Sequence, residues 1–350
     1  MKAVILSGGY GTRLRPLTYK TPKTLLPILN KPFVEYQLEL LKKNGVSEVI
    51  FCVQYHSDQL KEYLGNGSKY GMKFYYTHEE EPLDTAGAAK LAQPHFNDQP
   101  ILVCNGDVLT TINFIKMLKK HNDKKAMLTF AVKEVSDPSA FGVIKTNNNG
   151  FVTDFIEKPK NSTVKTINAG FYIIQPSLFQ YIPKDKPYSF ERQFFPEMLK
   201  LDHKMTTFLH EGYWLDIGKP AQYFQAHFDI IEKLSDQFNL TSEKTEPTIF
   251  IGEKYNTEPD CILENICFIG SNVTLGKKCY LDNVIIGNNC TIENNCNLRN
   301  VIIHNNVTIE KHSSIIDSII GNNTTIESMT TIAHPTILAA DSIIKKGTKS

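Results

Sequence analysis

The sequence predicts an α/β domain with a mostly parallel sheet, followed by a parallel β-helix. Two observations lead to this expectation. Up to about residue 229, short apolar runs alternate with helix-like segments, which is the order of a chain that builds a helix-covered parallel sheet. From residue 269 onward, single apolar residues recur every six positions, which indicates a coil with three short strands per turn.

The first half starts with a buried strand at residues 3–6, and the apolar runs at 50–53, 101–104, 127–132 and 151–156 predict further strands. A helix is expected over 34–43, because Asn44-Gly45 is a typical C-terminal stop, and another begins at Asp84 or Thr85. In parallel sheets, ligands bind beyond the carboxyl ends of the strands. We therefore expect the functional residues in the loops that follow these strands.

The second half repeats with a fixed period. Ile269, Ile286, Ile303 and Ile320 are each 17 residues apart, so one coil should take about that length. Cys290 and Cys296 should lie near coil corners, and His304 and His312 are expected in turns or on the surface. Before the repeats, a polar segment follows a predicted helix at 220–234. The predicted domains are thus 1–233, a linker at 234–248, and 249–350.

Composition excludes several classes of function. The net charge of +1 gives no basic footprint for nucleic acid or an acidic membrane surface. We expect no partner of either kind, and no apolar run has the length of a membrane span. The seven cysteines include no Cys-x-x-Cys pair, which favours reduced thiols in a cytoplasmic protein.

A glycine-rich turn directly after the first strand predicts a phosphate site. Gly8, Gly9 and Gly11 permit close approach and let backbone N–H groups converge on an anion. Arg13 and Lys23 add a fork of donors and a point charge. The spacing fits neither the P-loop nor the dinucleotide-binding pattern.

An acidic residue follows the strand at 101–104. Asp107, in Asn105-Gly106-Asp107, stands where a carboxylate would hold Mg²⁺, which prefers few carboxylates and several phosphate oxygens. A carboxylate that merely caps the next helix is the structural alternative. A second acidic candidate, Asp216, precedes the helix expected to start near Pro220.

The stretch GGYGTRLRPLTYKTPKTLLP resembles the signature of the sugar-1-phosphate nucleotidylyltransferases, also called sugar-nucleotide pyrophosphorylases. The resemblance implies a Rossmann-like nucleotidyltransferase domain and a left-handed β-helix of hexapeptide repeats. It also implies transfer of a nucleotidyl group to a sugar-1-phosphate with release of pyrophosphate. Arg13, Lys23, Asp107 and Asp216 would be catalytic, with Mg²⁺ bound by the two aspartates.

The same resemblance assigns the two substrate sites. Sugar-phosphate binding would fall to Gly142, Glu157, Lys158, Asn168 and Gly170. Nucleotide binding would involve Leu6, Gly8, Gly9, Gly11, Thr12, Arg13, Lys23, Glu80, Thr85, Ala86, Gly87 and Asp107.

Residues 79–87 correspond to the stretch that reads the base. Thymidylyl and uridylyl relatives tend to place glutamine there, whereas guanine presents two adjacent donors that a carboxylate accepts. Glu80, or a neighbouring glutamate, therefore points to GTP, and the stretch is similar to that of mannose-1-phosphate guanylyltransferases. Asp84 departs from the pattern, because relatives commonly have glycine at this position.

Several alternatives stay open at the level of sequence. The substrates could be dTTP or UTP with glucose-1-phosphate, or GTP with a heptose-1-phosphate. The chain could also be a regulatory paralogue that binds sugar nucleotide without catalysis. Acyltransferase activity in the repeats ranks lowest. A homo-oligomer through the β-helix or the catalytic domain is expected, since a solenoid offers an open end and flat faces.

Overall fold

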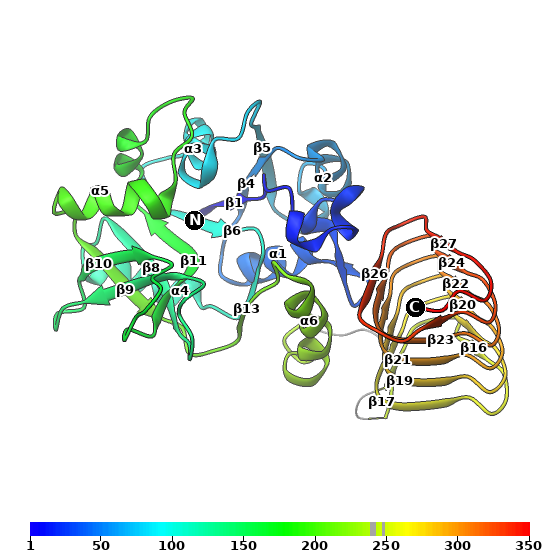
Figure 1. Cartoon of the computed structure of the whole chain (residues 1–350). Helices are drawn as coiled ribbons and strands as arrows, with labels where there is room; N and C mark the ends of the chain where they lie inside the picture. The colour runs from blue at the N-terminus through cyan, green and yellow to red at the C-terminus, as the bar shows by residue number, and fades with distance from the viewer. Residues whose placement is uncertain (239–242, 247–248) are drawn as a thin grey trace. The chain divides into compact units, whose positions relative to one another are not determined.

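The computed structural model describes residues 1–238, 243–246 and 249–350. The chain forms two compact units (Figure 1). One consists of residues 1–10 and 34–216, and the other of residues 11–33 and 217–350. Of the predicted linker at 234–248, residues 239–242 and 247–248 lie outside the described residues. The predicted domain boundaries therefore remain a prediction.

The first unit is built on a mixed sheet with the strand order β10-β9-β11-β6-β1-β4-β5. In addition, β8 pairs with β11, and β12 pairs with β8. Three strands of the sheet's parallel part, β1, β4 and β6, agree with the predicted strands, whereas β5 was not predicted. This part consists of β1 (Lys2–Leu6), β4 (Glu48–Val53), β5 (Lys73–His78) and β6 (Ile101–Asn105).

The rest of the sheet is largely antiparallel, which the sequence did not indicate. Antiparallel neighbours need only a short turn, and the turn at 147–150 joins two of these strands directly. The strands are β8 (Leu128–Glu134), β9 (Gly142–Thr146), β10 (Val152–Glu157), β11 (Thr166–Ile174) and β12 (Met205–Leu209).

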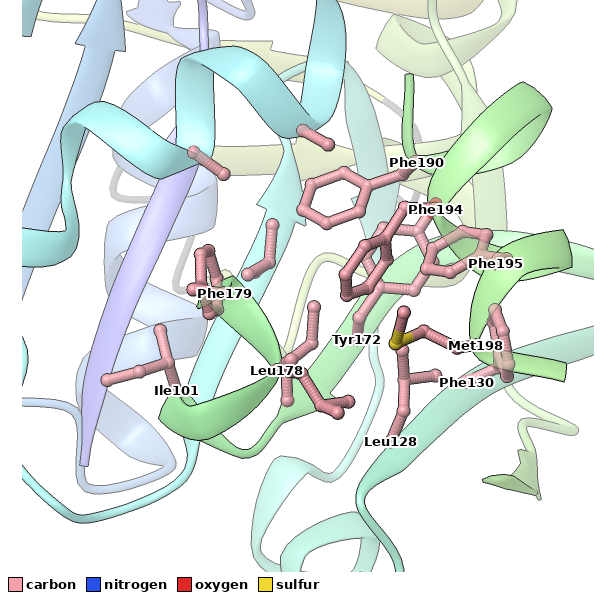
Figure 2. Packing of buried hydrophobic residues seen from close by; sticks show 14 of the residues in the cluster. Ile101, Leu128, Phe130, Tyr172, Leu178, Phe179, Phe190, Phe194, Phe195 and Met198 are labelled. Carbon is pink, nitrogen blue, oxygen red and sulfur yellow. The ribbon is translucent and has the colours of Figure 1, made fainter. Parts of the chain in front are cut away.

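Helices cover both faces of this sheet. On one face, the π-helical turn Phe190–Phe194 and α5 (Phe195–Lys200) pack aromatic side chains over Tyr172 and Phe130, as Figure 2 shows. The helices α3 (Asp84–Leu91), on that same face, and α1 (Phe33–Lys43) agree with the predicted helices. The others are α2 (Ser57–Leu64) and α4 (Phe114–Asp123).

The second unit contains the parallel β-helix and helix α6 (Pro220–Lys233). Its coils stack with the predicted period, because Ile269 pairs with Ile286, Ile286 with Ile303, and Ile303 with Ile320. These side chains are buried inside the coil. The longer strands are β14 (Glu243–Glu246), β15 (Ile249–Ile251), β17 (Ile262–Ile269), β19 (Tyr280–Ile286), β21 (Asn297–Ile303), β23 (Ser314–Ile320) and β26 (Thr336–Leu338).

Short strands complete the coils and one hairpin. The hairpin pairs β2 (Pro27–Ile28) with β3 (Lys31–Pro32). The coil strands are β16 (Asn256–Thr257), β18 (Thr274–Leu275), β20 (Thr291–Ile292), β22 (Thr308–Ile309), β24 (Thr325–Ile326), β25 (Thr331–Ile332) and β27 (Ile343–Ile344).

Asparagine side chains connect successive corners of the coil. Asn289 and Asn306 have φ values of 58° and 59°, a left-handed conformation that asparagine tolerates better than most residues. Each amide donates to the next one along the stack, and the ladder ends when Asn323 donates to Asp341 at 2.9 Å. A carboxylate suits the last position because it only accepts.

Two sequence expectations for the coil have different outcomes. Cys290 and Cys296 are buried, and their thiols donate to the backbone carbonyls of His304 and Glu310 in the next coil. His312 is exposed, as expected. His304, however, is buried, because its ring packs against Tyr223 of α6 and is not left on the surface.

Candidate functional site

The loop after β1 is shaped by a close contact between a glycine and a carboxylate. A Cβ on Gly8 would lie 2.6 Å from Oε1 of Glu79. Glycine therefore lets the chain pass this carboxylate without displacing it. Gly9 is exposed and has open space around the position of a Cβ. Leu6, at the end of β1, is partly buried and packs against the core of the sheet.

Asp107 lies on a tight loop between β6 and β7 (Val108–Thr110). The loop folds onto the end of β1, since Gly106 N donates to the Leu6 carbonyl at 3.0 Å and a Cβ there would clash with that carbonyl. From α1, the Gln37 amide donates to the carbonyls of Asn105 and Val108 at 2.9 and 3.3 Å. One buried side chain thus fixes both ends of the Asp107 loop, and no sequence motif pointed to it.

Asp216 reaches the same loop through strand pairing. It ends β13 (Trp214–Asp216), which pairs antiparallel with β7 so that Asp216 stands opposite Val108. Asp107 directly precedes Val108, so two aspartates that are more than a hundred residues apart lie at neighbouring positions. Trp214 holds this strand in place by donating from Nε1 to the Ala169 carbonyl at 2.9 Å.

The described residues contain no cluster of three or more His, Cys, Asp or Glu side chains arranged to hold a metal. Two neighbouring carboxylates fit a cation that takes most of its ligands from phosphate and water, as Mg²⁺ does. A site for a structural metal with a full protein cage would look different.

Two neighbouring glutamates within residues 79–87 lie in different environments. Glu80 is exposed, whereas Glu79 is buried and accepts a hydrogen bond from Leu83 N at 2.9 Å. Burial raises the pKa of the Glu79 carboxyl, although the Leu83 N–H partly offsets this. The glutamate nearest to the glycine-rich loop is thus Glu79.

Helix α3 is pinned to the segment near residue 188. Ala86 is fully buried, and both Ala86 N and Gly87 N donate to the Tyr188 carbonyl at 2.9 Å. A Cβ on Gly87 would lie 2.9 Å from the Lys186 carbonyl, so only glycine permits this approach. Ala86 and Gly87 therefore position α3.

Asp84, the departure from the family pattern, has a structural partner. It adopts a φ of 58° at the start of α3, and its carboxylate accepts from Thr85 N at 2.8 Å. The other oxygen pairs with the Arg192 guanidinium. The charge of Asp84 is therefore directed at Arg192 and at the helix start.

The sugar-phosphate candidates form a second group. Glu157 and Lys158 pair at 3.3 Å at the end of β10, and a Cβ on Gly142 would lie 2.8 Å from Oε2 of Glu157. Burial raises the pKa of the Glu157 carboxyl, although Lys158 partly offsets this. On β11, the side-chain oxygen Oδ1 of Asn168 accepts from Gly170 N at 3.0 Å. The side-chain nitrogen Nδ2 of Asn168 donates to the Tyr172 hydroxyl at 2.8 Å.

Glu191 links the two groups and was missed at the level of sequence. Its Oε2 accepts from the Thr85 hydroxyl at 2.9 Å, and its Oε1 accepts from the Tyr172 hydroxyl at 3.4 Å. Thr85 lies within residues 79–87, and the Tyr172 hydroxyl accepts from the Asn168 amide of the second group. No sequence motif marked Glu191, because its partners come from α3 and β11.

The remaining residues predicted to bind phosphate belong to the second unit. Thr12 and Arg13 are exposed on the short 3-10 helix Thr12–Leu14, and Lys23 starts another at Lys23–Leu25. A Cβ on Gly11 would lie 2.9 Å from Thr18 and 3.3 Å from Cβ of Lys23, and Gly11 has a φ of 60°. Gly11 thus lets these parts of the segment pack closely.

Comparison with known proteins defines the class. Residues 2–233 match the family model described as Nucleotidyl transferase. Residues 246–349 match the model described as EIF2B subunit epsilon LbH domain, in agreement with the expected β-helix of hexapeptide repeats. The chain therefore belongs to the nucleotidyl transferase family, an enzyme family whose members generally use a divalent metal.

Among similar proteins, the probable mannose-1-phosphate guanylyltransferase 3 of Oryza sativa subsp. japonica is 33% identical over 291 residues, covering 81% of this chain and 78% of the relative. The mannose-1-phosphate guanylyltransferase catalytic subunit beta of Drosophila melanogaster is 40% identical over 225 residues, covering 63% and 60%.

Two solved structures share the fold of the first two thirds of the chain. A putative glucose-1-phosphate thymidylyltransferase from Bacillus anthracis has a TM-score of 0.61 and 25% identity, covering 65% of this chain and 94% of that structure. HddC from Yersinia pseudotuberculosis, complexed with GMP-PN, has a TM-score of 0.57 and 30% identity, covering 65% and 99%. In the part of the chain that the structure describes, no helix is long and apolar enough to span a membrane.

Proposed function

We propose that this chain transfers a guanylyl group from GTP to mannose-1-phosphate, which yields GDP-mannose and pyrophosphate. A phosphate oxygen of the sugar-1-phosphate would attack the α-phosphorus of GTP, and the bond to the β-phosphate oxygen would break. The observation that carries the proposal is the pairing of β13 with β7, which brings Asp216 next to Asp107. The family match and the guanylyltransferase relatives support the reaction class.

Asp107 and Asp216 are the proposed ligands of Mg²⁺. When bound there, Mg²⁺ would neutralise charge on the two phosphate groups that must meet. The attacking oxygen is already an anion, so no side chain needs to remove a proton. What the protein contributes is positioning and charge compensation.

Arg13 and Lys23 are proposed to bind the triphosphate and the departing pyrophosphate. Gly8, Gly9, Gly11 and Thr12 would supply the surrounding loop. The nucleotide would be bound only indirectly by Leu6, Thr85, Ala86 and Gly87. The N–H groups of Ala86 and Gly87 already donate to the Tyr188 carbonyl.

For the sugar phosphate, Lys158 would bind the phosphate while Glu157 and Asn168 hydrogen-bond the hydroxyls. Glycine at position 142 lets β9 pack closely against the Glu157 carboxylate, and Gly170 takes a left-handed φ of 80°, so both glycines support the placement of the proposed sugar ligands.

For the base, guanine N1–H and the exocyclic amine would both donate to one carboxylate. The burial of Glu79 against Gly8 makes Glu79 a stronger candidate than the exposed Glu80. A buried carboxylate without competing water gives the larger discrimination between bases.

The second candidate is thymidylyl transfer to glucose-1-phosphate, which the similarity to the Bacillus anthracis protein favours. Both reactions use the same metal and phosphate groups, so the base-reading and sugar-binding residues must decide between them.

A panel of nucleoside triphosphates and sugar-1-phosphates, with pyrophosphate release as the readout, tests the assignment. GTP with mannose-1-phosphate should give the highest kcat/KM. A clear preference for dTTP or UTP with glucose-1-phosphate would replace the proposal, and no pyrophosphate from any pair would favour a non-catalytic role.

A further inference from the structure

The hairpin formed by β2 and β3 has a tip that is unfavourable by itself. Leu29 and Asn30, its two central residues, have φ values of 47° and 64°. A two-residue turn of this type normally takes Asn-Gly or Asp-Gly, because a leucine in the left-handed region is strained. Such a conformation persists when the surroundings hold it in place.

The tip is held by α6 and by the β-helix. Leu29 is buried, and its N–H donates to Nδ1 of His227 on α6 at 3.3 Å. The Asn30 amide donates to the Ile286 carbonyl and to Oδ1 of Asn288, at 3.4 and 3.3 Å. Gly270 accommodates this contact, since a Cβ there would lie 2.5 Å from Nδ2 of Asn30.

Helix α6 fastens the base of the hairpin to the same coils. The Tyr223 hydroxyl donates to the Pro27 carbonyl and lies 3.0 Å from Nε2 of His304. Both rings are buried, so this network is shielded from water and depends on the coil that carries His304.

A further contact holds the other side of the segment. Lys20 pairs with Asp341 at 2.6 Å, and Asp341 is the carboxylate on which the asparagine ladder ends. This pair is exposed, so it adds less free energy than the buried contacts. It does fix which part of the β-helix the segment meets.

Lys23 lies in the sequence between these anchors, and Arg13 lies ten residues before it. The Thr18 hydroxyl donates to the Gly11 carbonyl at 2.8 Å, and Leu26 N donates to the Lys23 carbonyl at 3.2 Å. The segment is therefore hydrogen-bonded within itself on both sides of Lys20, and Lys23 lies between Lys20 and the anchored hairpin.

We propose that the β-helix positions the side chains that bind the triphosphate, with Asn30 and Tyr223 as positioning residues for Lys23 and Arg13. The roles of Lys23 and Arg13 rest on the proposed function, whereas the anchoring of residues 11–33 does not. In this proposal the repeats are part of the nucleotide-binding machinery and do more than mediate self-association.

The test compares two chemically identical substitutions in the full-length protein. Asn30→Asp keeps the size and tolerates the left-handed turn, but it removes the amide that donates to Asn288. Asn272→Asp removes the same kind of donation, to Asn289 at 3.0 Å, at a φ of 56°. Asn272 makes this hydrogen bond within the coil stack, so it serves as the matched control.

Hydrogen–deuterium exchange of peptides that cover residues 11–33 is the first readout. Exchange there should rise in Asn30→Asp and in Tyr223→Phe, which loses only a hydroxyl, and stay at the wild-type rate in Asn272→Asp. Equal exchange in all four proteins would overturn the proposal, whatever the reaction turns out to be.

Steady-state kinetics with GTP and mannose-1-phosphate is the second readout. Losing a hydrogen bond of this kind should raise the KM for GTP about fivefold to tenfold and leave the KM for mannose-1-phosphate unchanged. An equal rise of both KM values would contradict the positioning role. If the wild type turns over no substrate pair, the function fails while the exchange result still decides the anchoring.

Discussion

Neighbouring residues of the same type have different chemistry here because their surroundings differ. Glu79 and Glu80 are adjacent in sequence, but one is buried against Gly8 and the other is exposed. Desolvation raises the pKa of the buried carboxyl and strengthens any hydrogen bond that it accepts. A motif identifies such a pair, but only the structure shows which member is buried.

Substituting the two glutamates separately should distinguish them. Glu79→Gln replaces one acceptor oxygen with a donor, so kcat/KM for GTP should fall by about tenfold or more. Glu80→Gln should stay within about twofold of wild type, because an exposed group contributes little. Steady-state kinetics at fixed mannose-1-phosphate measures both. A larger loss in the Glu80 variant would return the base-reading role to Glu80.

Asp216→Asn should weaken the metal requirement of the reaction. An amide is a poorer ligand for Mg²⁺ than a carboxylate, so half-maximal activity should need about tenfold more Mg²⁺. Asp154→Asn is the control, since Asp154 pairs with Lys145 on the antiparallel part of the sheet. An unchanged Mg²⁺ titration in Asp216→Asn would rule out the ligand role.

At the scale of elements, strands and helices bring distant residues to one loop. The pairing of β13 with β7 places Asp216 opposite Val108. Helix α1 contributes Gln37, whose amide donates to two carbonyls of the same loop. Neither contact follows from local sequence, because strand register and helix packing depend on the whole sheet.

Gln37→Met should loosen the Asp107 loop while filling the same space. Two carbonyls lose a buried donor, so the free energy of unfolding should fall by about 1–3 kcal/mol. Activity should drop more at limiting than at saturating Mg²⁺, because the loop that carries Asp107 is no longer fixed. Chemical denaturation and Mg²⁺ titrations check this, with Lys43→Met at the exposed end of α1 as control. Equal effects in both variants would remove Gln37 from this role.

At the scale of the whole molecule, buried neutral histidines make stability depend on pH. Burial lowers the pKa of His121 and of His304 to about 4. His121 accepts at Nε2 from the Gln175 amide, 3.1 Å away, which suits the neutral ring. Below the ordinary pKa of about 6.5 the unfolded chain binds protons that the folded protein does not.

The free energy of unfolding should therefore fall as the pH drops from about 6.5 towards 4. Glu79 and Glu157, whose pKa values are raised by burial, act in the opposite direction, so a variant must isolate the histidine contribution. His121→Gln should show a shallower loss over this range in urea denaturation at several pH values. Parallel curves for wild type and variant would contradict the prediction.

Much of this protein follows from local patterns. The six-residue period predicted the β-helix because an inward-pointing side chain must recur with every strand of the coil. The parallel strands, the helices at 34–43 and 220–234, and the glycine-rich turn followed from apolar runs and stop signals. The antiparallel pairing in the rest of the sheet was not predicted, because an apolar run indicates a buried strand but not its direction.

By itself, the sequence indicated a phosphate site after the first strand, and its resemblance to the sugar-1-phosphate nucleotidylyltransferases implied the reaction class. Only the tertiary structure decided which glutamate is buried beside Gly8, that Glu191 accepts from both Thr85 and Tyr172, and that residues 11–33 are held by the β-helix. The physical reason is that burial and contact between distant segments arise from packing, and local residue patterns do not encode how distant segments pack.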